Sequence, residues 1–493
     1  MHAPNTSKTR YAMLSCFPAF FLLLLWGCFP EPTQYTQGKA EKVAKAQKRS
    51  TSKNQGTPQR TPKASKILEL MALQHLPSSP RAFKDVQPKS RLAPMKLHSM
   101  DAPTFSTPGW DLSQKSQERF IAHEWGTFTS VQSSIGKTMD GLHHTEEALP
   151  NFVHRRRWGS PFRKSLEIVP IGVNQKLETP VIYFYTNKAT KVSVEVDFPK
   201  GILSEYYPNV TSFRPAIPYG GRQGAVPKGG FLRWDGDVKP GSATFPYVKP
   251  DDIWMPSRQV PAAIPFYAKL PRGRVEVEKF IFYRGVGRFV LPIQLTTNAK
   301  NEVTVFNNSK EKLPAFLLVV QNGKGKIVSL GTIQAGQKII QKIPTPVQTI
   351  DQYIDAATKS LAASLIKTGL YKDEAWAMVN TWRKSYFHTP GVRVLYVVPK
   401  NWTDALLPIR ISPKPTELVR TLVGRVDVLT VSEEQRVLAL VKTAYTNGHR
   451  YVDLKKLGRF AEPKLRRALE LLKDPKTIAY CAKQVEYARY YLQ

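Results

Sequence analysis

The stretch from 123 to 131 reads HEWGTFTSV and mixes aromatic with β-branched residues. That composition is typical of a β-strand. Residues 191–198, KVSVEVDF, alternate Val192, Val194 and Val196 with polar residues. Because side chains on a strand point alternately to its two faces, this pattern places the three valines on one buried face. Both stretches predict that the ordered part of the chain begins as β-sheet.

Further strand-like segments follow up to about Pro346, separated by proline and glycine. We expect strands over 181–185, 275–283, 288–295, 302–307, 315–320, 326–330 and 337–343. Asn322-Gly323, between two of these segments, is a typical β-hairpin turn. Short strands at regular spacing predict a sandwich-like arrangement of packed antiparallel sheets.

From Thr349 onward the apolar residues recur with helical spacing. The first helix is expected from Ile350 to a stop at Gly369, and Ser432 with Gln435 has the pattern of a capping box. The other helices are expected over 372–386, 432–445, 462–472 and 477–491, with one strand over 392–398. The sequence therefore predicts an α+β protein, with an N-terminal β-rich region followed by a helical C-terminal part.

The N-terminus has the pattern of a secretory signal. Lys8 and Arg10 precede an uncharged, apolar run from Tyr11 to Pro30. Residues 25–28, LWGC, resemble a bacterial lipoprotein box, in which Cys28 would carry the lipid. An uncleaved anchor helix and an ordinary cleaved signal are alternatives. All three place the bulk of the chain in the cell envelope, facing the periplasm or the cell exterior, and the first two anchor it to the membrane.

The chain is strongly basic, with 72 Lys and Arg against 38 Asp and Glu and a formal charge of +34. Residues 31–118 have too little apolar surface to offset the entropy of ordering, so we expect a disordered basic tether. The envelope location and the lack of any nucleic-acid-binding motif argue against nucleic acid as a partner. Anionic lipid or a wall polymer is the expected neighbour. The predicted organisation is a signal or anchor segment (1–30), the tether, a β-rich domain (119–346) and a mainly helical region (347–493).

Histidines and carboxylates gather near the start of the ordered region. The candidate ligands are His123, Glu124, His143, His144 and Glu147. Imidazole and carboxylate groups are common ligands of zinc, iron and manganese. A metal-dependent hydrolase that uses this cluster, between residues 123 and 154, is therefore one hypothesis. Ordinary ion pairs and hydrogen bonds are the alternative for the same residues.

No motif identifies a catalytic residue or a cofactor. The phosphate-loop, dinucleotide and nucleophile-elbow patterns each lack a required glycine. The three cysteines include no Cys-x-x-Cys pair, which excludes a disulfide framework and a cysteine-based zinc knuckle. Whether the protein is an enzyme stays open at this point.

Aromatic residues crowd the Pro- and Gly-rich stretch 201–261. If Trp234, Tyr247 and Trp254 lined an open groove, they would suit stacking on sugars, which makes a carbohydrate-binding module a further hypothesis. The alternative is that these rings form the core of an irregular region.

Several runs of sequence are distinctive. They are AHEWGTFTSV (122–131), LHHTEE (142–147), LETP (177–180), FYRGVG (282–287) and WTDALLP (402–408). Together they resemble a family of uncharacterised bacterial envelope proteins and lipoproteins over about 120–475. The resemblance implies an envelope location and the extent of the ordered part, and it implies no activity or residue role. The sequence thus favours a lipid- or membrane-anchored envelope protein that binds a surface polymer or an envelope partner.

Overall fold

A computed structural model describes most of the chain after residue 118. The described ranges are 119–145, 147–156, 171–215 and 228–491. All of them belong to Pro103–Gln493, one of the two units into which the chain divides. The expected signal segment, Cys28 and the tether lie outside the described residues. Within the described ranges, no helix combines the length and the apolar character needed to cross a membrane.

The largest sheet is organised around β1 (Phe120–Gln132), every residue of which is buried. β1 pairs in parallel with β20 (Glu417–Val428), and on its other side it pairs antiparallel with β3 (Gln175–Leu177) and β4 (Val181–Thr186). The order in the described part of this sheet is β17-β15-β14-β18-β20-β1-β3-β11-β6-β2, with β4 paired to β1 and β11. Its remaining strands are β2 (His154–Arg155), β6 (Gly201–Tyr207), β11 (Ile281–Gly287), β14 (Leu313–Gln321), β15 (Lys324–Ile333), β17 (Gln348–Thr349) and β18 (Gly391–Val397).

Two smaller sheets accompany the large one. The first has the order β10-β9-β8-β5-β19, with β7 paired to β8, and the second has the order β12-β13-β16. The strands of the first are β5 (Thr190–Phe198), β7 (Ser212–Arg214), β8 (Gly230–Val238), β9 (Phe266–Lys269), β10 (Val275–Glu278) and β19 (Ile409–Ser412). Those of the second are β12 (Ile293–Thr297), β13 (Glu302–Asn307) and β16 (Lys338–Lys342).

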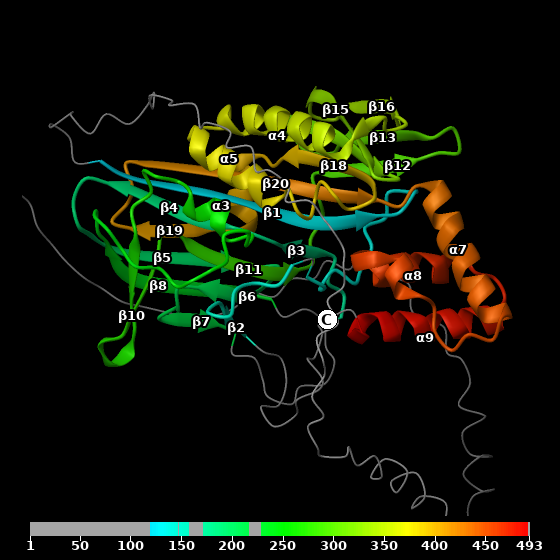
Figure 1. Cartoon of the computed structure of the whole chain (residues 1–493), viewed down its shortest axis with the longest axis horizontal. Helices are drawn as coiled ribbons and strands as arrows, with labels where there is room; N and C mark the ends of the chain where they lie inside the picture. The colour runs from blue at the N-terminus through cyan, green and yellow to red at the C-terminus, as the bar shows by residue number, and fades with distance from the viewer. Residues whose placement is uncertain (1–118, 146, 157–170, 216–227, 492–493) are drawn as a thin grey trace, which may run out of the picture. The chain divides into compact units, whose positions relative to one another are not determined.

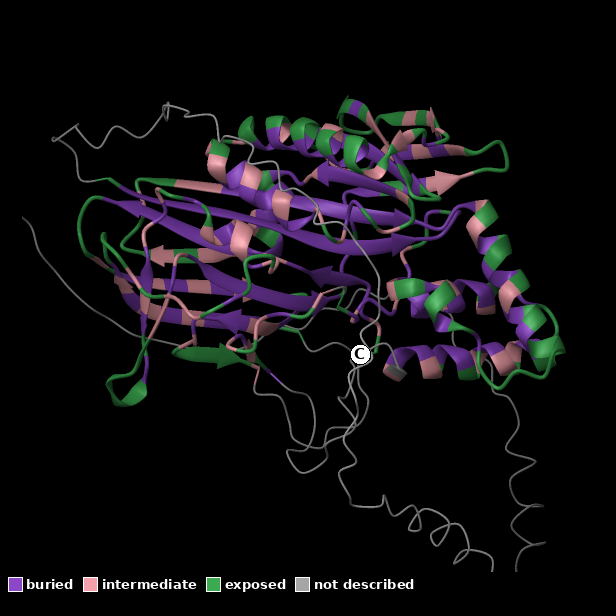
Figure 2. Ribbon diagram, viewed as in Figure 1, coloured by how far each residue is buried: buried purple, intermediate pink, exposed green. Residues whose placement is uncertain are grey.

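The large sheet is covered on both faces, which explains why β1 is buried along its whole length and β20 from Arg420 onward (Figure 2). Ala122 and Phe128 of β1 belong to a core shared with the smaller sheets. Ile121 and Trp125 point the opposite way, into a core shared with helices. Figure 1 shows the two helices between residues 350 and 381 lying over one face of the large sheet. The helices of this second core are α3 (Met255–Arg258), α4 (Ile350–Ile366) and α5 (Lys372–Thr381).

The C-terminal helices have a core of their own, in which Val441, Leu465 and Cys481 are fully or almost fully buried. They are α7 (Val431–Thr446), α8 (Ala461–Leu471) and α9 (Pro475–Tyr491). The short 3-10 turns η2 (Leu454–Lys456) and η3 (Gly458–Phe460) lie between α7 and α8, and α6 (Lys400–Leu406) comes earlier, before β19 and β20. α7 starts directly after the central strand β20. Its N-cap is Thr430, whose hydroxyl accepts from the Glu433 amide, so the cap lies two residues before the predicted Ser432.

The chain is β-rich in its middle and helical at its C-terminus, as the sequence predicts. The strand predicted over 302–307 is β13, and the predicted hairpin joins β14 to β15. Asn322 and Gly323 both have positive φ, 51° and 70°, as a type I′ turn requires. α4 is confirmed with little change, and the chain turns after it at Gly369, where φ is 104°.

Several predicted boundaries are wrong. The segment 275–283 is interrupted at 279–280, because the chain leaves the smaller sheet at β10 and enters the large sheet at β11. α5 ends at Thr381, five residues before the predicted end. The strands β19 and β20 are not predicted from the sequence at all. Because β18 and β20 join β14 and β1 in one sheet, the regions 119–346 and 347–493 share the large sheet.

Candidate functional site

His123 and Glu124, two of the predicted metal ligands, lie on opposite faces of the large sheet. His123 Nδ1 lies 2.7 Å from the Glu374 carboxylate, on the helical face. Glu124 accepts from Arg420 Nε at 2.7 Å and from the Tyr283 hydroxyl at 2.5 Å, on the other face. Neighbouring residues of a strand always separate in this way. These two side chains therefore cannot bind the same ion.

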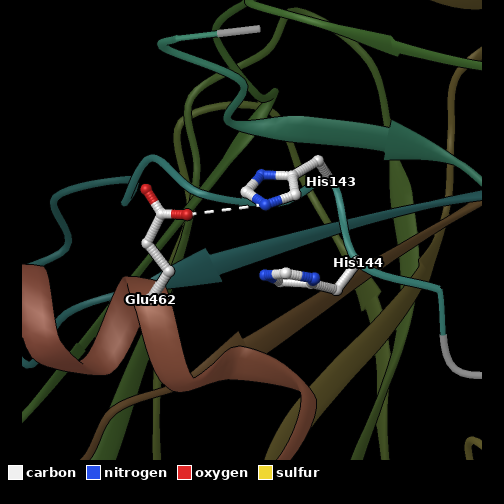
Figure 3. Close-up of side chains that lie close together, drawn as sticks. All are labelled: His143, His144 and Glu462. Carbon is white, nitrogen blue, oxygen red and sulfur yellow. Dashed lines mark ion pairs between the residues drawn. The ribbon is translucent and has the colours of Figure 1, made fainter. Parts of the chain in front are cut away.

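His143 and His144 do come together, and their third neighbour is Glu462 at the start of α8. One ligand atom from each of the three lies within 4.8 Å of the others, and both rings turn towards the carboxylate (Figure 3). His143 Nε2 lies 3.6 Å from Glu462 Oε2. All three side chains are buried or nearly so. Glu147 is not part of this group and lines the neighbouring cleft.

The backbone of the two histidines is held by a buried amine. Lys176 on β3 donates from Nζ to His143 O at 2.8 Å and to His144 O at 2.9 Å. Burial lowers the pKa of this amine to about 7, against the opposing effect of Glu178. Arg459 adds a bond from Nε to His144 O at 3.3 Å. The loop that carries the histidines is therefore fixed by donors from two separate elements.

Glu462 is oriented by arginines. Arg466 Nη2 lies 2.6 Å and Arg489 Nη2 lies 3.4 Å from Oε1, whereas Oε2 has no hydrogen-bond partner among the described residues and faces His143. Burial raises the pKa of Glu462, although both arginines oppose this shift. Gly141 (φ +107°) allows Glu462 to lie this close to the histidine loop, because a Cβ at position 141 would lie 2.7 Å from Glu462 Cγ.

Burial also determines the charge of the His143 imidazole. It lowers the pKa of His143 well below the ordinary value, and the neighbouring His144 lowers it further. His143 is therefore neutral at pH 7, and its Nε2 lies 3.1 Å from the Arg489 carbonyl. Two imidazoles and a carboxylate oxygen form a donor set that a zinc-class metal ion accepts.

A small cleft of about 40 Å³ opens beside this cluster. Its wall includes Glu178, Thr179, Arg284, Trp382, Tyr386 and Arg459. The guanidinium of Arg459 contacts both the Glu178 carboxylate and the His144 carbonyl. The cleft and the histidine cluster therefore share one wall.

Three residues of this wall carry side-chain donors without hydrogen-bond partners. They are Arg284 Nη1, Trp382 Nε1 and Thr179 Oγ1, all buried and unpartnered within the described part of the chain. The Arg284 guanidinium is fixed through Nε, which donates to Glu178 O at 2.8 Å. Guanidinium and indole N–H groups can only donate, so their natural partners are acceptor oxygens. The cleft thus offers donors to a ligand that brings oxygens.

Other groups of the cleft wall are already paired or stacked. Burial alone would raise the pKa of Glu178, but Arg459, Lys176 and Arg284 together hold it below the ordinary value, so Glu178 is ionised. Trp382 stacks on Tyr386 with ring centroids 5.7 Å apart and planes 10° apart. One side of the cleft is consequently aromatic.

The aromatic residues predicted for sugar binding do not share a surface. Trp234 is fully buried between the sheets and donates from Nε1 to Pro208 O at 2.8 Å. Trp254 is buried in the helical core and donates to Glu278 at 2.8 Å. Tyr247 is 82% exposed. The physical reason is that both indoles fill cores on different faces of the large sheet, so the three rings do not line one open groove.

Of the residues that line the cleft, the sequence analysis selected only Glu147, and as a metal ligand, although a signal for the others was present. Three of the distinctive runs meet here: 142–147 supplies the histidine pair and Glu147, 177–180 supplies Glu178 and Thr179, and 282–287 supplies Arg284. Runs that lie far apart in the sequence and converge on one cleft are a better guide to the site than the spacing within any one run.

Comparison with protein-family models finds no match, and comparison with curated proteins finds none either. Among solved structures, the chain is similar to the yeast delta-COP-I mu-homology domain complexed with a Dsl1 WxWxV peptide. The sequence identity is 7% and the TM-score is 0.23, over 63% of this chain and 97% of that chain. A TM-score this low supports no conclusion about fold or function.

Proposed function

We propose that this protein is an envelope protein, anchored through its N-terminal segment, whose cleft binds an oxyanion group of an anionic surface polymer. The observation that carries the proposal is the set of three unpartnered donors, Arg284 Nη1, Trp382 Nε1 and Thr179 Oγ1, on the wall of one cleft. The N-terminal signal pattern supports the location, and the formal charge of +34 favours an anionic partner.

The energetic argument rests on the cost of the unpartnered donors. A buried donor without a partner costs about 1–3 kcal/mol. A carboxylate or phosphate oxygen placed against Arg284 and Trp382 would remove that cost in the complex. Hydrogen bonds between a guanidinium and an oxyanion are also stronger than neutral ones, and the planar guanidinium suits carboxylate and phosphate oxygens. Because the donors are already held in place, little ordering entropy opposes binding.

The lining of the cleft suits a single oxyanion group of a polymer, since its volume of about 40 Å³ has room for one small group and not for a longer segment. The stacked rings of Trp382 and Tyr386 provide an apolar wall beside the donors. We propose further that the β-rich part is a sandwich-like scaffold that carries the cleft. We prefer binding to a metal-dependent hydrolase because only His143 and His144 of the five predicted ligands meet.

Calorimetric titration of the full-length chain, purified in mild detergent, tests the proposal. One arm uses a glycerol-phosphate oligomer, a second uses a uronic-acid oligomer of similar length, and a neutral oligosaccharide is the ligand control. Arg284→Gln should weaken binding about 10-fold or more, the range expected for a lost charged hydrogen bond. Arg288→Gln is the matched control, since this nearby arginine is exposed and pairs with Asp140.

The two anionic arms identify which oxyanion the cleft prefers. Equal affinity for Arg284→Gln and Arg288→Gln, with circular dichroism spectra unchanged, would contradict the proposal. So would the failure of both anionic oligomers to bind the parent chain.

A further inference from the structure

We propose that His143, His144 and Glu462 bind one divalent metal ion of the zinc class, and that this ion ties the histidine loop to α8. The inference stands apart from the oxyanion cleft, because it uses different side chains. It also differs from the metal site predicted from sequence, since one ligand comes from a C-terminal helix and His123, Glu124 and Glu147 take no part.

The first argument is the distance between the ligand atoms. In a tetrahedral zinc site with bonds of about 2.0–2.2 Å, ligand atoms lie roughly 3.3–3.6 Å from one another. His143 Nε2 and Glu462 Oε2 are already 3.6 Å apart. Nε2 also lies 3.1 Å from the Arg489 carbonyl, to which it donates its hydrogen, so binding the ion would move the proton of the neutral ring to Nδ1. A ring nitrogen of His144 completes a group whose members all lie within 4.8 Å. Side-chain adjustments of about an ångström would close the site around an ion.

The second argument is the orientation of Glu462. Arg466 and Arg489 both contact Oε1, which leaves Oε2 directed at the imidazole of His143 (Figure 3). The Glu462 side chain is only 2% exposed, and Oε2 has no hydrogen-bond partner within the described residues. A buried carboxylate oxygen without a partner is costly, and a metal ion would satisfy it. Hydrogen bonds to the second oxygen are the usual way in which a metal-binding carboxylate is oriented.

The third argument is that the surroundings fix the ligands in advance. Lys176 and Arg459 hold the carbonyls of both histidines, and Gly141 allows α8 to approach the loop. The loop follows β1, whereas Glu462 belongs to the C-terminal helices. An ion bound here would therefore link the large sheet to α8, and its removal should loosen the C-terminal helices.

The test is zinc binding by the full-length chain, purified without a polyhistidine tag and stripped with a chelator. After dialysis against zinc, mass spectrometry of the metal content should find about one equivalent per chain. His143→Ala and Glu462→Gln should each lose the bound equivalent. Zinc should raise the unfolding temperature of the parent and leave that of both variants unchanged.

The matched control is His154→Ala. His154 lies 2.9 Å from a Glu276 oxygen and so forms a histidine–carboxylate pair, but it belongs to no three-ligand group among the described residues. This variant should bind as much zinc as the parent. Substitution with cobalt adds an independent readout, since visible bands of a four-coordinate ion should appear in the parent and in His154→Ala only.

Two results would overturn the inference. One is a folded parent chain that retains no zinc after dialysis, which would assign the cluster to ion pairing alone. The other is equal zinc content in the parent, His143→Ala and Glu462→Gln. If Glu462→Gln does not fold, His144→Ala replaces it with the same expected loss. Neither result depends on whether the cleft binds an oxyanion.

Discussion

Glu124 is predicted to be essential for stability through a buried ion pair. Its carboxylate is fully buried and accepts from Arg420, at 2.7 Å from Nε and 2.6 Å from Nη2, and from the Tyr283 hydroxyl. The Arg420 side chain is 1% exposed. Replacing Glu124 by leucine leaves this guanidinium buried with its main counter-charge removed. Breaking such a pair costs about 3–5 kcal/mol of unfolding free energy.

A double variant distinguishes the contribution of the ion pair to stability from the contribution of side-chain packing. When Glu124→Leu is combined with Arg420→Met, no unpaired charge is left in the core, because Asp404 is partly exposed and keeps Lys400 at 2.5 Å. The double variant should therefore be more stable than either single variant, by about 2 kcal/mol or more. Urea denaturation of the parent, both single variants and the double variant measures the coupling. Additive losses in the double variant would refute the assignment of Glu124 to this pair.

Three further outcomes follow from other parts of the structure. Burial raises the pKa of the Cys481 thiol to about 12, so a thiol reagent at pH 8 should leave this cysteine unmodified until the chain unfolds, and peptide mapping that finds rapid labelling would contradict this. Gly424→Ala should lower the unfolding free energy by about 1–3 kcal/mol, because its Cβ would lie 2.3 Å from the buried Tyr396 ring; an unchanged denaturation midpoint would count against it. Trp382→Phe keeps the aromatic wall and removes the N–H donor, so oxyanion affinity should fall by roughly 3- to 10-fold in calorimetry, and an unaltered affinity would exclude a role for the indole N–H.

Regular periodicity made much of the fold predictable. β13, the Asn322-Gly323 hairpin and α4 each follow from short-range patterns that tertiary contacts reinforce. β20 was not predicted, because polar residues interrupt the apolar pattern that a buried strand usually has. Arg425 and Asp427 give this strand a polar appearance, yet both are buried, and they pair with each other at 2.6 Å. Asp427 also pairs with Arg393 of the neighbouring strand β18 at 3.3 Å. Such long-range charge pairing lets polar residues occupy a central strand, and a local pattern does not reveal it.

The candidate site was predictable only in part, for the same physical reason. That His123 and Glu124 lie on opposite faces follows from strand alternation alone. That Glu462 meets His143 and His144 does not, because it depends on how α8 packs after β20 has joined the sheet. Such contacts between distant segments are determined by topology rather than by spacing in the sequence.

The most direct test of the central claim observes the indole N–H of Trp382 while the ligand is added. The full-length chain labelled with ¹⁵N-tryptophan has nine indole groups, and Trp382→Phe identifies the signal of this one. With the preferred anionic oligomer, the Trp382 signal should shift as its N–H gains an oxygen acceptor, and the neutral oligosaccharide should leave it in place. A Trp382 signal that does not move at a saturating concentration of the anionic oligomer would contradict binding in the cleft.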